Sequence, residues 1–174
     1  MALSKIDAAN FLTGTIPSTN VANASLSSVT SLPAAITTGK VLQVVQGSTS
    51  TEVAHSTSYA DTGLSASITP SSTSNKVLIL VNQHCKAQGP NGVSLKLLRD
   101  STAIYTPAQS YSFYIDTTDA HIRGHQSFNY LDSPSSTSAI TYKTQGIKYR
   151  SDNTAHTQSG SRWTSFITLM EVSA

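Results

Sequence analysis

From residue 40 onward, short apolar runs alternate with polar residues, and clusters of Ser, Thr, Asn, Gly and Pro separate the runs. A period of two is typical of β-strands, because successive side chains point to opposite faces of a sheet. The pattern predicts an all-β fold, an antiparallel β-sandwich of the jelly-roll kind, over residues 39–174. The expected strands are Val41–Gln46, Glu52–Ser58, Leu64–Thr69, Lys76–His84, Val93–Arg99, Ala103–Tyr105, His121–Leu131, Ile140–Tyr149 and Arg162–Val172.

Two of these runs carry specific expectations about burial. Lys76–Val81 is apolar on both faces, so we expect a central strand that is covered on both sides. Within Val93–Leu97, three apolar residues alternate with Ser94 and Lys96, which predicts a strand with one solvated face. Turns are expected at Pro70–Asn75 and at Gly89–Gly92, where Asn and Gly both tolerate positive φ.

Residues 1–38 follow neither a strand nor a helix period, and their apolar residues stand singly among small and polar ones. One interpretation is a flexible tail. The other is a stalk, in which three copies each contribute one apolar residue per layer to a shared core. The residues that would form that core are Ile6, Phe11, Leu12, Ile16, Val21, Leu26, Val29 and Leu32.

The composition favours a folded β-protein. Charged residues are 11% of the 174 residues, against about 25% in ordinary globular domains, while the hydrophobic share is 38%. A disordered chain would have fewer hydrophobic residues and a larger net charge than +2. Scattered Lys and Arg residues and the small net charge predict no nucleic-acid partner.

Several classes of chemistry find little support in the sequence. The single cysteine, Cys85, follows an apolar run, which predicts a buried small side chain rather than a reactive thiol. The histidines show no metal-binding spacing, so we expect no metal and no cofactor. No nucleophile elbow or paired-carboxylate arrangement is present, and we expect no enzymatic activity. Without an apolar leader or a long apolar segment, we expect a protein made in a cytoplasm with no membrane insertion.

The long segment between residues 106 and 120 and the tight turn near residue 91 are candidates for recognition, since binding residues concentrate on loops. Aromatic side chains there could stack on sugar rings, and polar neighbours could hydrogen-bond a glycan. The alternative is that the aromatic residues pin the loop to the sandwich or fill a subunit interface. The candidate contact residues are Tyr105, Gln109, Tyr111, Phe113, Tyr114, Asp116 and Asn91, with Tyr130 as a further aromatic neighbour.

Several segments carry a resemblance to a known class of protein. They are GKVLQVV from residue 39, SITPSSTSNKVLILVN from 67, SLKLLRDST from 94, YLDSPSSTS from 130 and FITLMEV from 166. Together they resemble the C-terminal β-sandwich domain of bacteriophage tail-fibre and virion-surface fibre proteins, of the type found in phages of marine bacteria and cyanobacteria. The segment GTIPSTNVANASL from residue 14 is similar to stretches that precede such domains in phage fibres.

The resemblance implies a non-enzymatic virion structural protein: a short homotrimeric tail fibre that attaches to a bacterial surface glycan or protein. Its N-terminal residues would join another virion protein. Because the chain is short for an adsorption fibre, two alternatives remain open. One is a capsid decoration or head-fibre protein, and the other is a small glycan-binding, lectin-like module.

Overall fold

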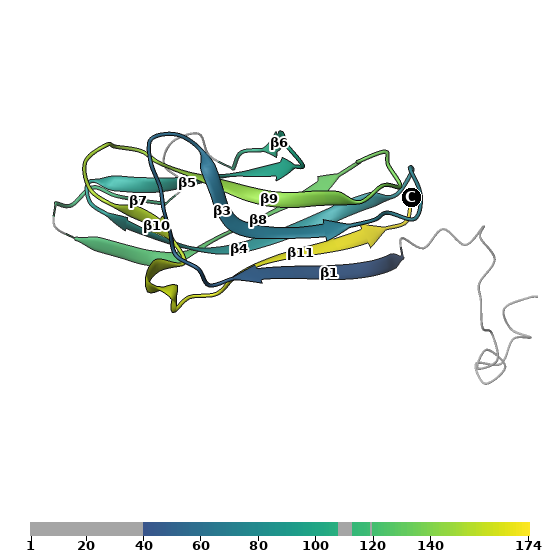
Figure 1. Cartoon of the computed structure of the whole chain (residues 1–174), viewed down its shortest axis with the longest axis horizontal. Coiled ribbons are helices and arrows are strands. Elements are labelled where there is room, and N and C mark those ends of the chain that lie inside the picture. The colour runs from purple at the N-terminus through teal and green to yellow at the C-terminus, as the bar shows by residue number, and fades with distance from the viewer. Residues whose placement is uncertain (1–39, 108–112, 119) are drawn as a thin grey trace, which may run out of the picture. The chain divides into compact units, whose positions relative to one another are not determined.

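The computed structural model describes residues 40–107, 113–118 and 120–174, which form two antiparallel β-sheets, one of six strands and one of five. The sheets face each other as a sandwich (Figure 1). The elements of the described part are β1 (Val41–Thr49), β2 (Val53–Ala54), β3 (Ala60–Ile68), β4 (Lys76–Gln88), β5 (Asn91–Arg99), β6 (Thr102–Tyr105), β7 (Phe113–Ile115), β8 (His121–Asp132), β9 (Ile140–Lys148), β10 (Ala155–Thr157), the 3-10 helix η3 (Ser159–Ser161) and β11 (Ser165–Val172).

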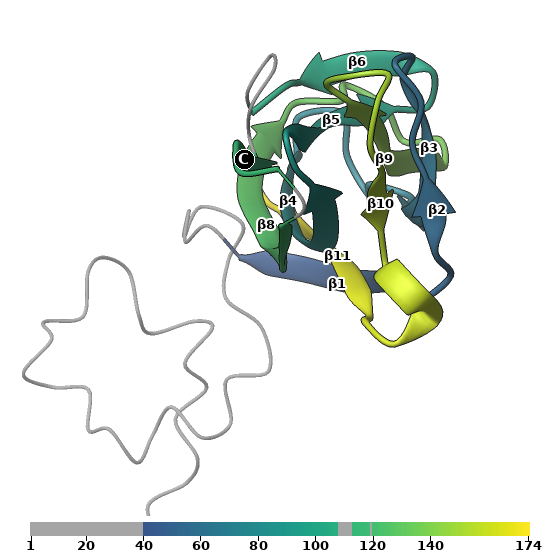
Figure 2. The same cartoon turned by 90° about the vertical axis from the view of Figure 1, so that its left-hand side faces the viewer.

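Sheet A contains β1, β11, β4 and β8 side by side, with β10 and β2 continuing the sheet beside the second half of β4. Sheet B contains β3, β9 and β5, followed by β6 and β7 along the free edge of β5. Figure 2 shows the two layers from one end of the strands, with β8 on one side and β3 on the other.

The strand pairs are nested along the chain. The first strand, β1, pairs with the last, β11, and then β3 pairs with β9, β4 with β8, and β5 with β6 and β7. Such nesting describes one long two-stranded ribbon that closes at β5 and is rolled into two sheets, which is the jelly-roll architecture. The predicted all-β, antiparallel, jelly-roll-like sandwich is therefore confirmed.

Alternate residues of both sheets point inward and build the main apolar core between them. At the far end of β4 a second cluster continues the core, with Cys85, Val93, Leu95 and Ala155 at its centre. Cys85 is fully buried and burial raises the pKa of its thiol, so the expected buried, small side chain is confirmed. The main core consists of Leu64, Ile68, Val77, Ile79, Val81, Leu97, Ile140, Tyr142, Ile167 and Leu169.

Some local predictions need correction. The expected strand at Glu52–Ser58 is reduced to two residues, and β7 and β10 form within segments that we expected to be loops. The expected turn at Gly89–Gly92 is shorter than predicted, because Asn91 already begins β5 and both Asn91 and Gly92 pair with β7. The chain reverses at Gly89–Pro90, across a cis peptide bond.

The two burial expectations for the central strands are also wrong in part. Lys76–Val81 is central within sheet A, but only its inner face is covered, and Leu80 is 37% exposed on the outer face. In β5, Ser94 is buried although we expected it to be solvated, while Lys96 is half-buried with its Nζ 4.1 Å from the centroid of the Tyr59 ring. The hydrophobic pattern of a strand does not show whether other parts of the chain cover its outer face.

Candidate functional site

The sandwich has two ends that carry different features. At the entry end, Val41, Val172 and Lys76 lie in register, and Figure 1 shows the C-terminus beside the start of β1. At the opposite, distal end, Gln88 pairs with His121, and β5 begins opposite β7. The connections at or towards the distal end include residues 50–52, 55–59, 89–90, 116–118, 149–154 and 158–164. The predicted recognition loop therefore leads to the distal end through β7.

Four aromatic residues in and around the candidate recognition loop pack onto the sandwich. The Tyr105 ring lies 5.2 Å from that of Tyr130 and 5.7 Å from that of Phe128, centroid to centroid, and all three pack against the main core. Phe113 packs against the second core cluster and sits above Gly124. For Tyr105 and Phe113, these contacts match the alternative in which aromatic residues fix the loop to the sandwich.

Tyr114 and Asp116 lie closer to solvent. The Tyr114 hydroxyl donates to Asp116 Oδ1 over 3.2 Å, and its ring meets the half-exposed Tyr149 ring edge-on at 6.0 Å. The partial desolvation of Tyr114 and the nearby Asp116 carboxylate both raise the pKa of Tyr114. These side chains remain available as candidate contact residues. Gln109 and Tyr111 lie outside the described residues, as do all eight residues predicted for the N-terminal stalk.

Asn91 has a structural position instead of the predicted surface position. Its side chain is fully buried, and its Nδ2 donates to the backbone oxygens of Arg150 and Asp152 at 3.2 and 2.8 Å. Its Oδ1 accepts from the backbone N–H groups of Gly92 and Arg150, both at 2.9 Å. Asn91 thus ties the start of β5 to the 149–154 loop and is not exposed for receptor contact.

The sequence reasoning missed a second aromatic site in the distal half of the sandwich. Trp163, the one tryptophan of the chain, falls within a segment that we expected to be strand, but β11 begins only at Ser165. The indole is 45% exposed and stacks on the His84 ring at 4.8 Å with an interplanar angle of 5°. His125 meets it edge-on at 6.3 Å. A lone Trp beside Arg in the Gly- and Ser-containing stretch SGSRWT was the available signal.

His84 is a neutral support for that indole. Its side chain is 1% exposed, and its Nδ1 accepts from the backbone N–H of Ser159 at 3.4 Å. Desolvation, followed by the positive charges of His125 and Arg123, lowers the pKa of His84 to about 4. At neutral pH the ring therefore adds no charge, and it holds one face of the indole in place.

A hollow of about 560 Å³ opens next to the indole, which we call the Trp163 hollow. Its volume lies within the range of small-ligand sites, about 300–1,000 Å³. Neither of its two guanidinium groups forms an ion pair with an Asp or Glu of the described residues. The residues that line it are Arg123, Ser159, Gly160, Arg162 and Trp163.

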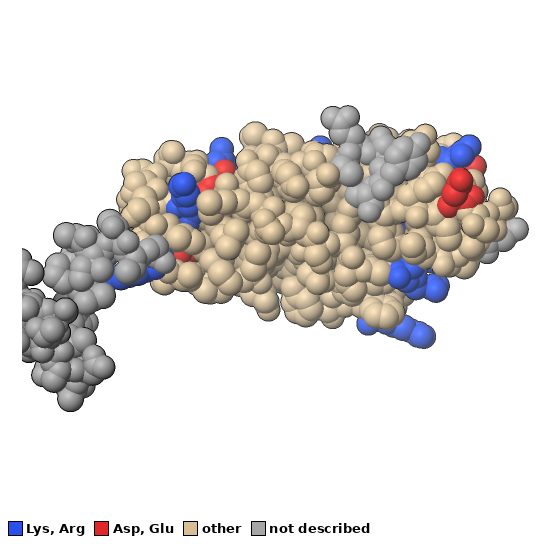
Figure 3. All heavy atoms as spheres, turned by 180° about the vertical axis from the view of Figure 1, so that it is seen from behind, with Lys and Arg blue, Asp and Glu red and all other residues tan. Residues whose placement is uncertain are grey.

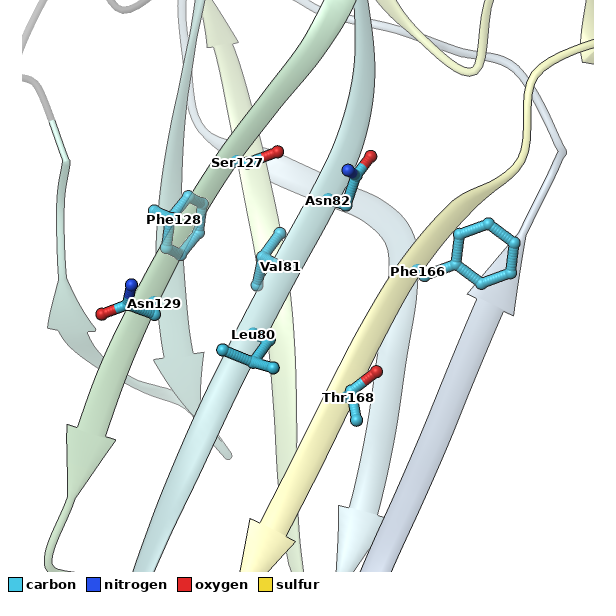
Figure 4. Close-up of a pocket in the computed structure, with 8 residues that line it drawn as sticks. All are labelled: Leu80, Val81, Asn82, Ser127, Phe128, Asn129, Phe166 and Thr168. Carbon is cyan, nitrogen blue, oxygen red and sulfur yellow. The ribbon is translucent and has the colours of Figure 1, made fainter.

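The outer face of sheet A carries the other notable surface. One row across four strands is entirely apolar, since Val44 pairs with Met170, Met170 with Leu78, and Leu78 with Leu131. Beside it, a shallow depression of about 360 Å³ lies between β8, β4 and β11, where Leu80 and Phe166 stand among the polar side chains of Asn82, Ser127, Asn129 and Thr168 (Figure 4). Figure 3, seen from the β8 side, shows an uncharged middle with charged side chains towards both ends. Antiparallel sheets usually present polar side chains to water, so this apolar row is unusual, whereas the rows beside it mix apolar and polar residues.

Two further observations concern metals and membranes. The described residues contain no group of three or more His, Cys, Asp or Glu side chains placed to hold one metal ion. Within the same part of the chain, no helix has the length and apolar character needed to cross a bilayer.

Comparisons with known proteins give only distant likenesses. No protein-family model matches the chain, and no curated protein matches it. Among solved structures, the infectious bursal disease virus VP2 subviral particle matches with a TM-score of 0.42 and 13% identity, over 76% of this chain and 40% of that one. The T13 particle of the same virus matches with a TM-score of 0.39 and 14% identity, over 78% of this chain and 38% of that one.

The chain thus spans about two fifths of the length of the structures that it matches. The identities and TM-scores are low, so the likeness by itself assigns neither an activity nor a location to this chain.

Proposed function

We propose that the chain is a structural protein of a bacteriophage particle, a short trimeric tail fibre whose jelly-roll head attaches to the host surface. The observation that carries this proposal is that the two ends of the described domain differ. The chain enters and leaves the sandwich at one end, while the exposed aromatic and basic side chains of the Trp163 hollow and the Tyr114 region lie towards the other. An attachment protein needs this separation between an anchored end and a binding end.

The fold is compatible with this proposal. Jelly rolls recur in viral coat proteins and in lectins, although a fold alone does not define a function. The segments from residue 39 onward that resemble phage fibre domains fall largely on strands of the sandwich, including β1, β4, β5 and β11. Residues 1–38 would then join the head to another virion protein.

The apolar outer face of sheet A supports association of copies. In a monomer, Leu80, Leu131 and Phe166 would remain 37%, 50% and 40% exposed on this face. Burial of such side chains against another copy is favourable by about 25 cal/mol per Å² of apolar area. The face also favours the second candidate function, a capsid decoration protein, because it could instead rest on a capsid subunit.

Competition for adsorption tests the proposed function. Bacterial host cells are incubated with purified full-length chain before particles are added, and free particles are counted over time. We expect the chain to bind the cells and to slow adsorption in proportion to the amount bound. A decoration protein would leave adsorption unchanged, and that result, together with absence of the chain from washed cells, would contradict attachment.

A further inference from the structure

The Trp163 hollow combines two kinds of recognition chemistry on a rigid base. One face of the indole is held by His84, while the side chain stays 45% exposed. The π-face of an aromatic ring is weakly negative, and it packs well against the weakly positive C–H groups on one face of a pyranose ring. An indole that is already fixed loses little conformational freedom when a sugar binds.

The two guanidinium groups that line the hollow have no ion-pair partner among the described residues. Arg123 lies directly opposite Lys86 across the β4–β8 ladder, and such like-charge pairs are destabilising unless an anion joins them. Arg162 adds a second guanidinium to the lining. Glu52 is an acidic residue beside this region: its carboxylate accepts from the Gly160 backbone N–H, lies 3.1 Å from His156 Nδ1 and offsets part of the charge of Lys86, but it forms no ion pair with Arg123 or Arg162. The lining therefore favours an anionic ligand.

Guanidinium groups are planar, remain charged at all working pH values, and bind carboxylates through two parallel hydrogen bonds. A ligand that satisfies both the indole and the guanidinium groups has a pyranose ring that carries a carboxylate. Ser159 and Gly160 complete the lining, and their backbone N–H groups are bound to His84 Nδ1 and to the Glu52 carboxylate.

We propose that the Trp163 hollow binds acidic saccharides of the uronic-acid class, with Trp163 stacking on a sugar ring and Arg123 and Arg162 binding its carboxylate. The biological setting of this inference rests on the proposed attachment function, in which the ligand is a unit of an acidic surface polysaccharide. Single-stranded nucleic acid also combines stacking with negative charge. It usually requires several aromatic platforms along a basic groove, whereas a single aromatic ring lines this hollow and the net charge is only +2.

Intrinsic fluorescence provides a direct measurement, because the chain has one tryptophan and it lines the hollow. The full chain is titrated with a trisaccharide of galacturonic acid and, separately, with the matching neutral galactose trisaccharide. We expect a saturable change with the acidic sugar and at least roughly tenfold weaker binding of the neutral one, since charge-assisted hydrogen bonds are lost.

Two variants and a matched control locate the site. R123Q and R162Q are each expected to weaken binding of the acidic trisaccharide by roughly tenfold or more. R150Q changes another exposed arginine of the distal end that pairs with Asp152 and does not line the hollow, so its affinity is expected to match that of the unaltered chain. All three substitutions are at surface positions, and circular dichroism checks that the fold is retained.

Several results would overturn the assignment. These are equal binding of the acidic and neutral sugars, unchanged affinity in R123Q and R162Q, no saturation up to roughly 10 mM, or tighter binding of a single-stranded oligonucleotide. The outcome is separable from that of the attachment proposal. If R123Q and R162Q still compete for adsorption as the unaltered chain does, the hollow is excluded as the attachment site, while the attachment function itself stands. If the acidic sugar binds but no variant of the chain reaches host cells, attachment fails while the saccharide site stands.

Discussion

Glu171 is buried at the entry end of the sandwich, and both of its carboxylate oxygens accept hydrogen bonds. Its Oε1 accepts from Ser71 N and Ser71 Oγ, both at 2.7 Å, and from Asn75 Nδ2 at 2.6 Å. Its Oε2 accepts from Gln43 Nε2 at 2.6 Å. The group joins β11 to β1 and to the loop before β4, so three segments depend on one side chain.

The pKa of Glu171 is set by two opposing effects. Desolvation raises it, but the hydrogen bonds from Gln43, Asn75 and Ser71 outweigh this effect and lower it from 4.5 to about 2. Because the folded state holds the lower pKa, the stabilisation is complete above about pH 4.5 and is lost as the pH falls towards 2.

We expect E171Q to lower the free energy of unfolding at pH 7 by about 2 kcal/mol, the scale of hydrogen bonds to a charged group. The difference from the unaltered chain should shrink between pH 4.5 and pH 2. Urea unfolding at pH 7 and pH 3 measures it. D152N removes an exposed ion pair and serves as the control, with a loss of about 0–1 kcal/mol. An equal loss for E171Q at both pH values would show that the charge is not responsible.

The sequence predicted some residues well and others poorly, for physical reasons. Cys85 follows an apolar run, so its burial could be predicted from its neighbours alone. Asn91 was misassigned because Asn-Gly favours tight turns, whereas here the side chain is buried in hydrogen bonds to a loop almost sixty residues away. Trp163 was missed because its exposure depends on where β11 begins, which the pattern leaves open by a few residues.

At the scale of elements, Gly47 shows how closely the two sheets approach. A Cβ at this position would lie 1.9 Å from the backbone oxygen of Ser65 in β3, and a backbone atom cannot rotate aside. The strands β1 and β3 belong to different sheets, so Gly47 marks a place where the sandwich is closed by backbone packing.

We therefore expect G47A to lower the free energy of unfolding by at least about 2 kcal/mol, because β1 must move away from β3. S48A, at the next and exposed position of β1, should change it by less than about 0.5 kcal/mol. Chemical denaturation of the two variants compares them directly. Similar stability of G47A and S48A would mean that the close approach of the strands is easily relieved.

The period-two pattern predicted most of the strands and the sandwich, because alternation of apolar residues reports the inner face directly. It did not predict β7 and β10, each of three residues, since so short a strand depends on a neighbouring edge rather than on its own sequence. The same pattern correctly indicated that β4 has apolar residues on its outer face as well. It could not show whether this chain or another molecule covers that face.

At the scale of the whole molecule, that uncovered face makes association testable. If copies meet through the outer face of sheet A, the double variant L80K/L131K places two charges in the contact and should convert an oligomer into a folded monomer. Light scattering on the full chain measures the mass. S67K, an exposed position on sheet B opposite the uncharged Thr141, is the control and should keep the oligomer. A monomeric unaltered chain would contradict the proposed trimer.

We propose that this jelly roll is the attachment head of a short phage fibre, and its location on the particle tests that proposal most directly. Antibodies raised against residues 40–174 are bound to purified particles, which are then imaged by electron microscopy with gold labelling. We predict label at the tip of the tail. An even distribution of label over the capsid would contradict the claim and favour the decoration protein.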